Sequence, residues 1–468
     1  MTAAARRDRV EHGLRSALQI KGREPETFTL AERMERYHVP GVALAAIDDG
    51  EVSWAGGYGV AVAGGALVHA TTLFQAASIS KAVSAVAVLA LVEHGAIDLD
   101  ADVNSQLRSW QLPASEYTAE QPVTVSHLLS HRAGTTVPGF PGYPAGTVLP
   151  SAVDVLSGVN GASTPAVESF ARPGTVTQYS GGGSTIVQQL VTDVTGRPFA
   201  DVVHELVLRP LGMVDSAFDQ PLAHSRTHRA ASGHDGEGRP TLGGHHDYAE
   251  LQAAGLWTTV VDLARWLIAV QGMVRGDTGG PISPQTALMM VTPVDGGPFG
   301  LGPEIAGSGG DARFGHTGSN EGFRGFAEAL VDRPVGGVVL ANAEGGNSLM
   351  GEVRLAFAAE YGWGEVGAPP IELAEVDPTV LRSYAGRYVG PFDRPLRLVF
   401  DDGELFSPTS YGRRRMLPLG PTTFLDEETG ATLEVHVDGQ HVIRIGVEVG
   451  GSELMSFDPV TTNEAEGQ

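Results

Sequence analysis

Residues 73–95 read Leu-Phe-Gln-Ala-Ala-Ser-Ile-Ser-Lys-Ala-Val-Ser-Ala-Val-Ala-Val-Leu-Ala-Leu-Val-Glu-His-Gly. From Ile79 to His94 the segment is rich in Ala, Val and Leu, and Gly95 stands where helices commonly end. This pattern predicts a helix that is buried on nearly all sides. At about 16 residues the apolar run is too short to span a bilayer, so a core helix is the better interpretation.

The first turn of this predicted helix carries Ser78 and Lys81, three residues apart and therefore on one face. A hydroxyl at a helix N-terminus lies in the positive end of the helix dipole, and an amine one turn later can take its proton if burial lowers the amine pKa. Ser80 is a competing hydroxyl, but it points elsewhere. Of the 31 Lys and Arg residues only two are lysines, Lys21 and Lys81, and arginine cannot act as a base. A chance or snorkelling lysine is the alternative explanation.

Length and composition limit the classes of protein to which the chain can belong. Its 468 residues suffice for two or three domains. The net charge of −24 argues against nucleic acid and anionic membranes as partners. The absence of cysteine excludes disulfides and thiolate chemistry. His127 and His131 have a helical i, i+4 spacing that could bind a metal, but without a third ligand packing or capping is favoured, and we expect no metal and no cofactor.

The N-terminal residues 1–20 contain Arg6, Arg7 and Arg9, but acidic residues are interspersed and no apolar segment follows. We therefore expect no signal peptide, no membrane segment and a cytoplasmic location.

Strand patterns lie at both ends of the first three quarters of the chain. The runs 41–47 and 51–58 flank an Asp-Asp-Gly turn, and the runs 323–331 and 336–342 precede a helix at 348–361. We predict an α+β fold, in which one antiparallel sheet is built from both ends and flanked by helices, with an all-helical insertion between them. After Ala368-Pro-Pro, short strands with turn signals predict a small all-β barrel or sandwich.

The predicted organisation is an N-terminal extension (1–27), a catalytic domain (28–367), a linker (368–378), a β domain (379–460) and a tail (461–468). Two further stretches carry candidate site residues. The Gly- and Pro-rich loop 133–150 presents Phe140 and Tyr143, which could wall a pocket or simply connect elements. Tyr179 stands at the end of an extended segment, before glycines and a helix predicted from Ser184. The histidines of 221–248 are interpreted as surface residues.

Taken as a set, Ser78-x-x-Lys81, Tyr179-Ser180-Gly181 and His316-Thr317-Gly318 resemble the motifs of the penicillin-recognising serine hydrolases. The resemblance is strongest to the class C β-lactamase-like branch, which includes D-alanyl-D-alanine carboxypeptidases, D-aminopeptidases and family VIII carboxylesterases. It covers roughly residues 28 to 362. The C-terminal module resembles the lipocalin-like β domains appended to several D-aminopeptidase relatives.

This resemblance implies a role for each motif residue. Ser78 would be the nucleophile, Lys81 its general base, and Tyr179 a second group for proton transfer, as base in acylation or as acid toward the leaving group. His316 stands where many relatives carry Lys. The backbone N–H groups of Ser78 and Ser319 would form the oxyanion hole. Further residues would bind substrate: Phe140, Tyr143, Gly181, Thr317 and Gly318.

Two departures from the family pattern affect the expected substrate. Gly181 replaces an Asn whose amide helps to hold the substrate, and His316 replaces a cation that suits a free carboxylate. We therefore expect a serine hydrolase that cleaves a small ester or amide through an acyl-enzyme, of esterase or acyltransferase type. A D-amino-acid peptidase and a β-lactamase are the alternatives, a non-catalytic ligand-binding or sensor protein is the alternative of another class, and a homo-oligomer is left open.

Overall fold

The computed structural model describes residues 2–16, 18–62, 64–364, 366–367, 369–390, 395–409, 412–427, 430–439, 441–449 and 452–460. The chain divides into two compact units, which we call the sheet unit (Met1–Leu14 and Phe28–Val366) and the barrel unit (Arg15–Thr27 and Gly367–Gln468). The predicted N-terminal extension is thus shared between the units. The predicted tail, 461–468, lies outside the described residues.

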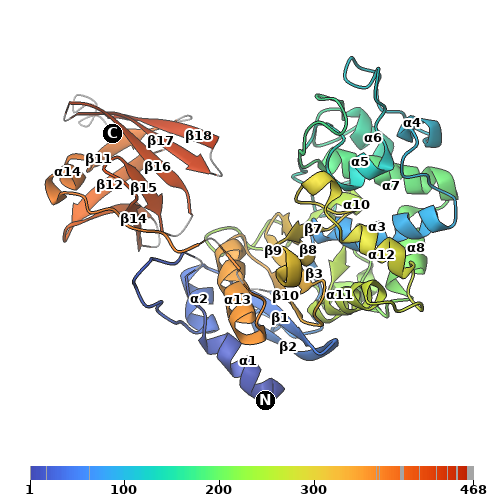
Figure 1. Cartoon of the computed structure of the whole chain (residues 1–468), viewed down its shortest axis with the longest axis horizontal. Coiled ribbons are helices and arrows are strands. Elements are labelled where there is room, and N and C mark those ends of the chain that lie inside the picture. Colours follow the sequence, from blue (N-terminus) through green and yellow to red (C-terminus); the bar gives the residue numbers. More distant parts are fainter. Residues whose placement is uncertain are drawn as a thin grey trace. The chain divides into compact units, whose positions relative to one another are not determined.

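The sheet unit is organised around a six-stranded antiparallel sheet in the order β2-β1-β10-β9-β8-β7 (Figure 1). Its strands are β1 (Gly41–Asp48), β2 (Glu51–Gly59), β7 (Glu304–Ala306), β8 (Arg313–Asn320), β9 (Phe323–Leu330) and β10 (Gly336–Ala341). Val42 of β1 lies opposite Ala341 of β10, so the two ends of the segment meet in the middle of the sheet. The predicted α+β fold is confirmed, and the short edge strand β7 was not among the predicted strands.

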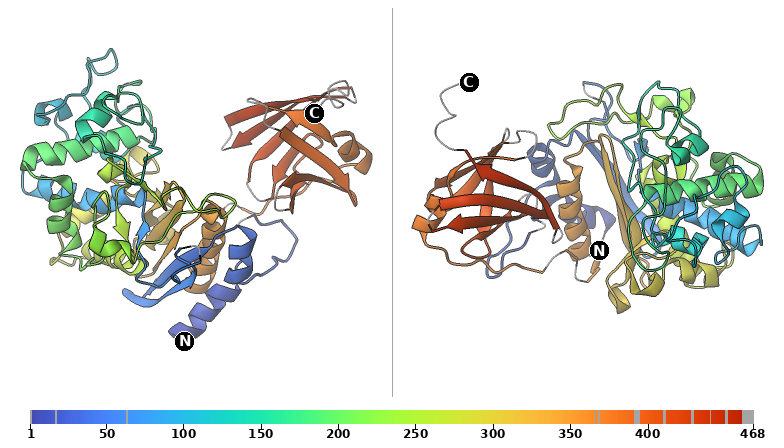
Figure 2. Two further views of the ribbon diagram at one scale, coloured as in Figure 1. Left: turned by 180° about the vertical axis from the view of Figure 1, so that it is seen from behind. Right: turned by 90° about the horizontal axis from the view of Figure 1, so that it is seen from above.

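Helices cover both faces of this sheet (Figure 2). One face packs against α13 (Gly346–Tyr361), with α1 (Ala3–His12) and α2 (Leu30–Arg36) nearby, and the other packs against α11 (Val260–Val274) and α3 (Ile79–Glu93). The central strand β1 is apolar and buried from Gly41 to Ile47, because alternate side chains enter both layers. Val42, Leu44 and Ala46 pack on the α13 side, and their neighbours along the strand pack on the α3 side.

The insertion between β2 and β7 is mainly helical, as predicted. Its longest helices are α3, α11 and α7 (Gly181–Thr195). The shorter ones are α4 (Val103–Gln106), α5 (Val125–Leu129), α6 (Ala152–Ser157), α8 (Phe199–Val203), the π-helix η1 (His204–Leu208), α9 (His224–Thr227), α10 (Leu251–Ala254), α12 (Pro284–Met290) and the 3₁₀ turn η2 (Val294–Gly296), with η3 (Gly309–Asp311) between β7 and β8. Every residue of α3 from Ile79 to Leu91 is buried, which confirms the core helix. Across the described residues, no helix is both long and apolar enough to cross a membrane.

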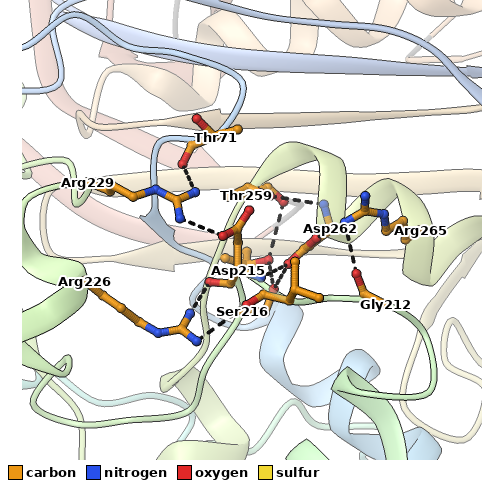
Figure 3. A network of polar contacts seen from close by, with 11 residues as sticks. Thr71, Gly212, Asp215, Ser216, Arg226, Arg229, Thr259, Asp262 and Arg265 are labelled. Carbon is orange, nitrogen blue, oxygen red and sulfur yellow. Dashed lines mark hydrogen bonds and ion pairs between the residues drawn. The ribbon is translucent and has the colours of Figure 1, made fainter.

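Two short strand pairs occur in the insertion, and one of them includes the segment that leads into α3. Strand β3 (Phe74–Gln75) pairs with β6 (Trp257–Thr258), and β4 (Tyr143–Pro144) pairs with β5 (His246–Asp247). Strand β6 is held by a polar network around the buried Asp262 (Figure 3). The Asp262 carboxylate accepts hydrogen bonds from the Ser216 hydroxyl at 2.9 Å and from Arg265 at 2.7 Å, and Ser216 Oγ lies 2.7 Å from Thr258 Oγ1. Because β6 pairs with β3, this network fixes the segment that leads into Ser78.

The barrel unit is a closed antiparallel barrel preceded by helix α14 (Pro378–Ser383). Its strands are β11 (Gly386–Val389), β12 (Pro395–Asp401), β13 (Glu404–Thr409), β14 (Gly412–Pro418), β15 (Thr423–Asp426), β16 (Thr432–Asp438), β17 (His441–Val449) and β18 (Ser452–Pro459). The predicted all-β module is confirmed as a barrel. Large side chains such as Tyr388, Met416 and Phe424 form its core, so the barrel is packed by its own residues.

Candidate active site

Ser78 is the N-cap residue of α3, and a strained backbone precedes it. Ala77 adopts a left-handed φ of 49°, which is unfavourable for a residue with a Cβ and is typical of functional sites. Strand β8 passes directly beside this turn. A Cβ at Gly318 would stand 2.3 Å from the Ala76 carbonyl oxygen, so the glycine of the His-Thr-Gly motif allows β8 to approach the nucleophile.

Lys81 projects from the first turn of α3 toward Ser78, as the spacing predicted. Its side chain is only 4% exposed, and Nζ lies 3.1 Å from Ser78 Oγ and 2.8 Å from the Ala253 carbonyl oxygen. Burial lowers the pKa of Lys81 from its ordinary value of 10.5 to about 7, although the negative charge of Glu304 acts in the opposite direction. The competing Ser80 hydroxyl donates to the Ala77 carbonyl and accepts from Leu256 N–H, and is thereby occupied away from the site.

Tyr179 lies against both Ser78 and Lys81. Its hydroxyl shares a hydrogen bond with Ser78, and Lys81 Nζ lies 4.9 Å from the centroid of its ring. Burial raises the pKa of Tyr179, an effect that the hydrogen bond to Ser78 partly offsets, so the phenol is neutral at ordinary pH. The ring of His131 packs on Tyr179 with centroids 4.3 Å apart.

The helix after Tyr179 begins earlier than predicted. It begins at Gly181, capped by the Ser180 hydroxyl, which accepts from Gly183 N–H at 2.8 Å. The prediction of a start at Ser184 was wrong because helix propensity counts glycines as breakers. Here they are needed for space, since a Cβ at Gly182 would stand 2.7 Å from the Thr136 carbonyl oxygen.

His316 reaches the same group of side chains from β8. Its Nδ1 lies 2.5 Å from the Thr317 carbonyl oxygen, which fixes Nδ1 as the protonated nitrogen. Nε2 is buried and finds no hydrogen-bond partner among the described residues. Burial lowers the pKa of His316, so that the imidazole stays neutral at pH 7, although the charge of Glu304 opposes this effect.

Glu304 completes the group, and no sequence pattern pointed to it. It stands on the short edge strand β7 after a Gly- and Pro-rich stretch without periodicity. Its carboxylate accepts a hydrogen bond from the Thr317 hydroxyl at 2.9 Å and lies 3.4 Å from His316 Nδ1. The side chain is 35% exposed.

Ser78, Tyr179, Glu304 and His316 line one cavity of about 620 Å³. The Thr317, Gly318 and Ser319 segment of β8 also lines it, so both residues predicted to supply oxyanion N–H groups face the same space. The cavity continues around β8 toward α13, where its lining includes Phe326, Glu328, Asn347, Met350 and Arg354. A volume of this size suits a small-molecule substrate.

The structure places other predicted site residues away from this lining. Tyr143 is buried, and its hydroxyl lies 3.2 Å from a carboxylate oxygen of Glu250. Phe140 covers Gly181, where an added Cβ would stand 2.9 Å from the Phe140 ring. Neither aromatic residue nor Gly181 lines the cavity described above. Their roles in substrate binding stay predictions.

The histidines of the insertion serve packing and capping. His127 caps the N-terminus of α5 together with Thr124, and Nδ1 of His131 accepts from Ser180 N–H at 3.2 Å. The interpretation of His234 as a surface residue was wrong, because it is fully buried with Nδ1 2.8 Å from the Asn342 carbonyl oxygen. Within the described ranges, no group of three His, Asp or Glu side chains could hold a metal ion.

Comparison with known proteins identifies the family. The model of the family described as "Beta-lactamase" matches residues 29–359. The chain belongs to this beta-lactamase family. The family contains the motifs from which the resemblance was inferred, and that inference is confirmed.

Similar proteins in this family carry several names. Unguisins hydrolase ungD' of Aspergillus campestris is 30% identical over 197 residues, which are 40% of this chain and 34% of that protein. Esterase EstB of Burkholderia gladioli is 32% identical over 234 residues, which are 48% of this chain and 57% of that protein. Penicillin-binding protein 4 of Amycolatopsis lactamdurans is 30% identical over 183 residues, 38% of this chain and 45% of that protein. The chain thus matches about a third to just over half of the length of these relatives. The family and these names support a serine hydrolase in general.

Solved structures extend the likeness of fold to both units. The octameric penicillin-binding protein homologue from Pyrococcus abyssi has a TM-score of 0.62 at 22% identity, covering 92% of this chain and 98% of that chain. The crystal structure of SurE with D-Leu has a TM-score of 0.58 at 23% identity, with coverage of 92% and 97%.

Proposed function

We propose that this beta-lactamase family member cleaves a small ester or amide through an acyl-enzyme on Ser78, as an esterase or acyltransferase. One observation carries the proposal: the Ser78 hydroxyl lies 3.1 Å from the amine of a buried lysine whose pKa is lowered to about 7. A hydroxyl is a weak nucleophile and needs such a base beside it. At neutral pH and above, a large share of Lys81 is therefore free to accept the proton.

In the acylation step, Ser78 Oγ attacks the carbonyl carbon of the substrate while neutral Lys81 takes the hydroxyl proton. The carbonyl oxygen becomes an oxyanion, which the backbone N–H groups of Ser78 and Ser319 would stabilise. Tyr179 then gives its phenolic proton to the leaving group as the bond to the carbonyl carbon breaks. A raised pKa suits Tyr179 to act as the acid and not as the base. Lys81 returns the proton to Tyr179.

Deacylation repeats the same chemistry with water or an acceptor amine in place of Ser78. The incoming group loses its proton to the Lys81 and Tyr179 pair, attacks the acyl carbon, and Ser78 Oγ leaves with a proton restored to it. Water gives the acid and an amine gives an amide, so the same site supports hydrolysis and acyl transfer. Neutral His316 would contribute a polar contact without a positive charge.

A D-amino-acid peptidase is the second candidate, because Tyr179 is placed to protonate an amine leaving group. The names of similar proteins cover both possibilities, since one is an esterase and one solved structure holds D-Leu. Gly181 in place of the family's Asn favours the esterase over a β-lactamase. The acylation residues alone do not separate an ester from an amide substrate.

Time-resolved mass spectrometry of the intact protein, with peptide mapping, tests the proposal. The protein is mixed separately with a short-chain p-nitrophenyl ester, a D-amino-acid nitroanilide and a penicillin, and Ser78→Ala is the matched control. We expect a transient acyl adduct on Ser78 with the ester and none on the variant. An equal rate of ester turnover by Ser78→Ala would refute the mechanism, and an adduct that never decays would favour the ligand-binding alternative.

We also propose that the chain forms a homo-oligomer. The support is the octamer named for the Pyrococcus homologue, whose fold extends over 92% of this chain. Light scattering coupled to size-exclusion chromatography tests this directly, and a mass of 48.9 kDa, that of one chain, would contradict it.

A further inference from the structure

Among the described residues that line the cavity beside Ser78, one carboxylate forms no ion pair with Lys or Arg. Glu328 accepts hydrogen bonds from Arg354 at 2.6 and 2.5 Å and from Arg313 at 3.2 Å, so its charge is balanced by arginines. Glu304 contacts the Thr317 hydroxyl and the neutral imidazole of His316. Among the described residues, no Lys or Arg forms an ion pair with Glu304 within 4.0 Å.

Glu304 lies close enough to the reacting groups to influence them. Its negative charge acts on the pKa of Lys81, of Tyr179 and of His316, which surround Ser78 Oγ. The register of β7 against β8 places Glu304 opposite Gly315, one residue before His316. With a side chain 35% exposed, Glu304 is accessible to a ligand and partly shielded from water, and ion pairs are stronger there than on an open surface.

The sign of the charge therefore differs from that in the relatives that carry a lysine at this position. A lysine at position 316 would place a cation beside the substrate, whereas this chain places a neutral histidine and an adjacent carboxylate there. The charge of Glu304 reaches Arg354, whose pKa it raises, but the Arg354 guanidinium is bonded to Glu328 and forms no ion pair with Glu304 within 4.0 Å. An anionic substrate group beside Glu304 would therefore meet a carboxylate that no ion pair with Lys or Arg neutralises. A substrate with an ammonium group would instead supply the missing cation.

We propose that Glu304 binds an ammonium group of the substrate, so that the preferred substrates are amine-bearing esters or amides. This inference rests on the proposed function, because it concerns the same cavity. Either half of the substrate can carry the ammonium group: the acyl half as an amino-acyl group, or the leaving half as an amino-alcohol or amine. The shared feature is a cation within reach of Glu304 while the scissile carbonyl lies at Ser78 Oγ.

Isosteric substrate pairs test the proposal, because each pair differs only in the charge. For the acyl half, alanine 4-nitroanilide is compared with isobutyryl 4-nitroanilide, in both enantiomers of alanine. For the leaving half, butyrylthiocholine is compared with 3,3-dimethylbutyl thiobutyrate. The quantity measured is the ratio of kcat/KM for the charged member to that for the neutral member, which cancels any general damage to the acylation residues.

We expect at least one pair to show a ratio above one in the wild type, and Glu304→Gln to lower that ratio about tenfold. Glu304→Asp should keep part of the preference because it retains the charge. Glu344→Gln is the matched control: Glu344 is also 35% exposed but lies outside the cavity lining, so its removal should leave the ratio unchanged. The pair that responds identifies the half of the substrate that carries the amine.

Equal ratios in the wild type and Glu304→Gln for both pairs would overturn the inference while leaving the proposed function intact, since the neutral members would still be cleaved. If no pair is turned over, the rate of Ser78 labelling decides instead. Diphenyl 1-aminoethylphosphonate is compared with diphenyl 1-methylethylphosphonate; Ser78 Oγ bonds to phosphorus and phenol leaves. Faster labelling by the amine that depends on Glu304 supports the inference, and equal labelling rates overturn it.

Discussion

Replacing Lys81 with Met should stabilise the sheet unit while abolishing activity. Because burial lowers the pKa of Lys81 from 10.5 to about 7, the folded state at pH 7 disfavours a proton that the unfolded chain holds firmly. A tenfold change in a protonation equilibrium corresponds to about 1.4 kcal/mol, so the buried amine costs roughly 4 kcal/mol at pH 7. The variant also loses the hydrogen bond from Nζ to the Ala253 carbonyl, which destabilises it by about 1 kcal/mol, so its net gain in stability is about 3 kcal/mol.

The stability difference between Lys81→Met and the wild type should depend on pH. Below pH 7 the amine is protonated in both states, and the cost is fully present. Between about pH 7 and pH 10.5 the unfolded chain binds a proton that the folded chain lacks, so wild-type stability rises by about 1.4 kcal/mol per pH unit relative to the variant. The advantage of Lys81→Met should therefore shrink by about 3 kcal/mol between about pH 7.5 and pH 9.5.

Urea unfolding of the full chain at these two pH values measures the difference. Lys21→Met is the matched control, since Lys21 is the other lysine, exposed and paired with Glu372 of the barrel unit at 2.9 Å. With only two lysines, ¹³C-lysine labelling also yields just two side-chain signals, and Lys21→Arg assigns them, so the Lys81 titration is observed directly. A gain in stability that does not change with pH would refute the reasoning, as would a Lys81 signal that titrates near 10.5.

Three further outcomes follow from the same geometry. The kcat/KM for a neutral ester, measured by stopped flow, should rise with pH through a midpoint near 7 as Lys81 loses its proton. In the same assay the kcat/KM of Lys81→Arg should fall to background, because guanidinium accepts no proton. Gly181→Asn should destabilise the sheet unit by about 1 to 3 kcal/mol in thermal melts, because the new Cβ would meet the Phe140 ring, and Phe140→Ala added to it should recover part of the loss. Burial raises the pKa of Glu250 from 4.5 to about 7, so between these pH values the unfolded chain has lost a proton that the folded chain keeps, and wild-type stability should fall by roughly 3 kcal/mol from about pH 4.5 to pH 7. Glu250→Gln should lack this decrease. If the free energies of unfolding of wild type and variant, measured with urea, changed with pH in parallel, the prediction would be contradicted.

The parts of the fold that sequence predicts well are those with strong periodicity. The two hairpins and α3 have apolar patterns that only a buried sheet or a buried helix satisfies, so they could be placed before the structure. Strand β14 is hard to recognise from the sequence, because Arg413, Arg414 and Arg415 make it polar. In the structure these arginines form ion pairs with acidic residues of the barrel. Strand β7 has only three residues, too few to show alternation.

Some residues of the candidate site could likewise be predicted from local sequence, and others could not. Ser78 and Lys81 could be paired from the sequence because helix geometry fixes residues three apart on one face. Tyr179 and His316 depended on the resemblance to a family, since nothing local brings positions 179 and 316 to position 78. Glu304 was not found at all, because its position depends on the pairing of β7 with β8, a tertiary contact without a sequence pattern.

The residues that transfer protons in this site are mostly neutral in the resting enzyme, and charge develops on them during the reaction. Burial favours the neutral forms of Lys81, Tyr179 and His316, so attack by Ser78 adds two charges beside the one that Glu304 already carries: an ammonium on Lys81 and an oxyanion on the substrate. A fixed negative charge at Glu304 stabilises the ammonium, as its upward effect on the Lys81 pKa indicates. The same carboxylate would draw a substrate cation toward Ser78. Substrate choice and base strength are therefore coupled through one residue, and a change at Glu304 cannot alter the first without shifting the pH at which Lys81 becomes active.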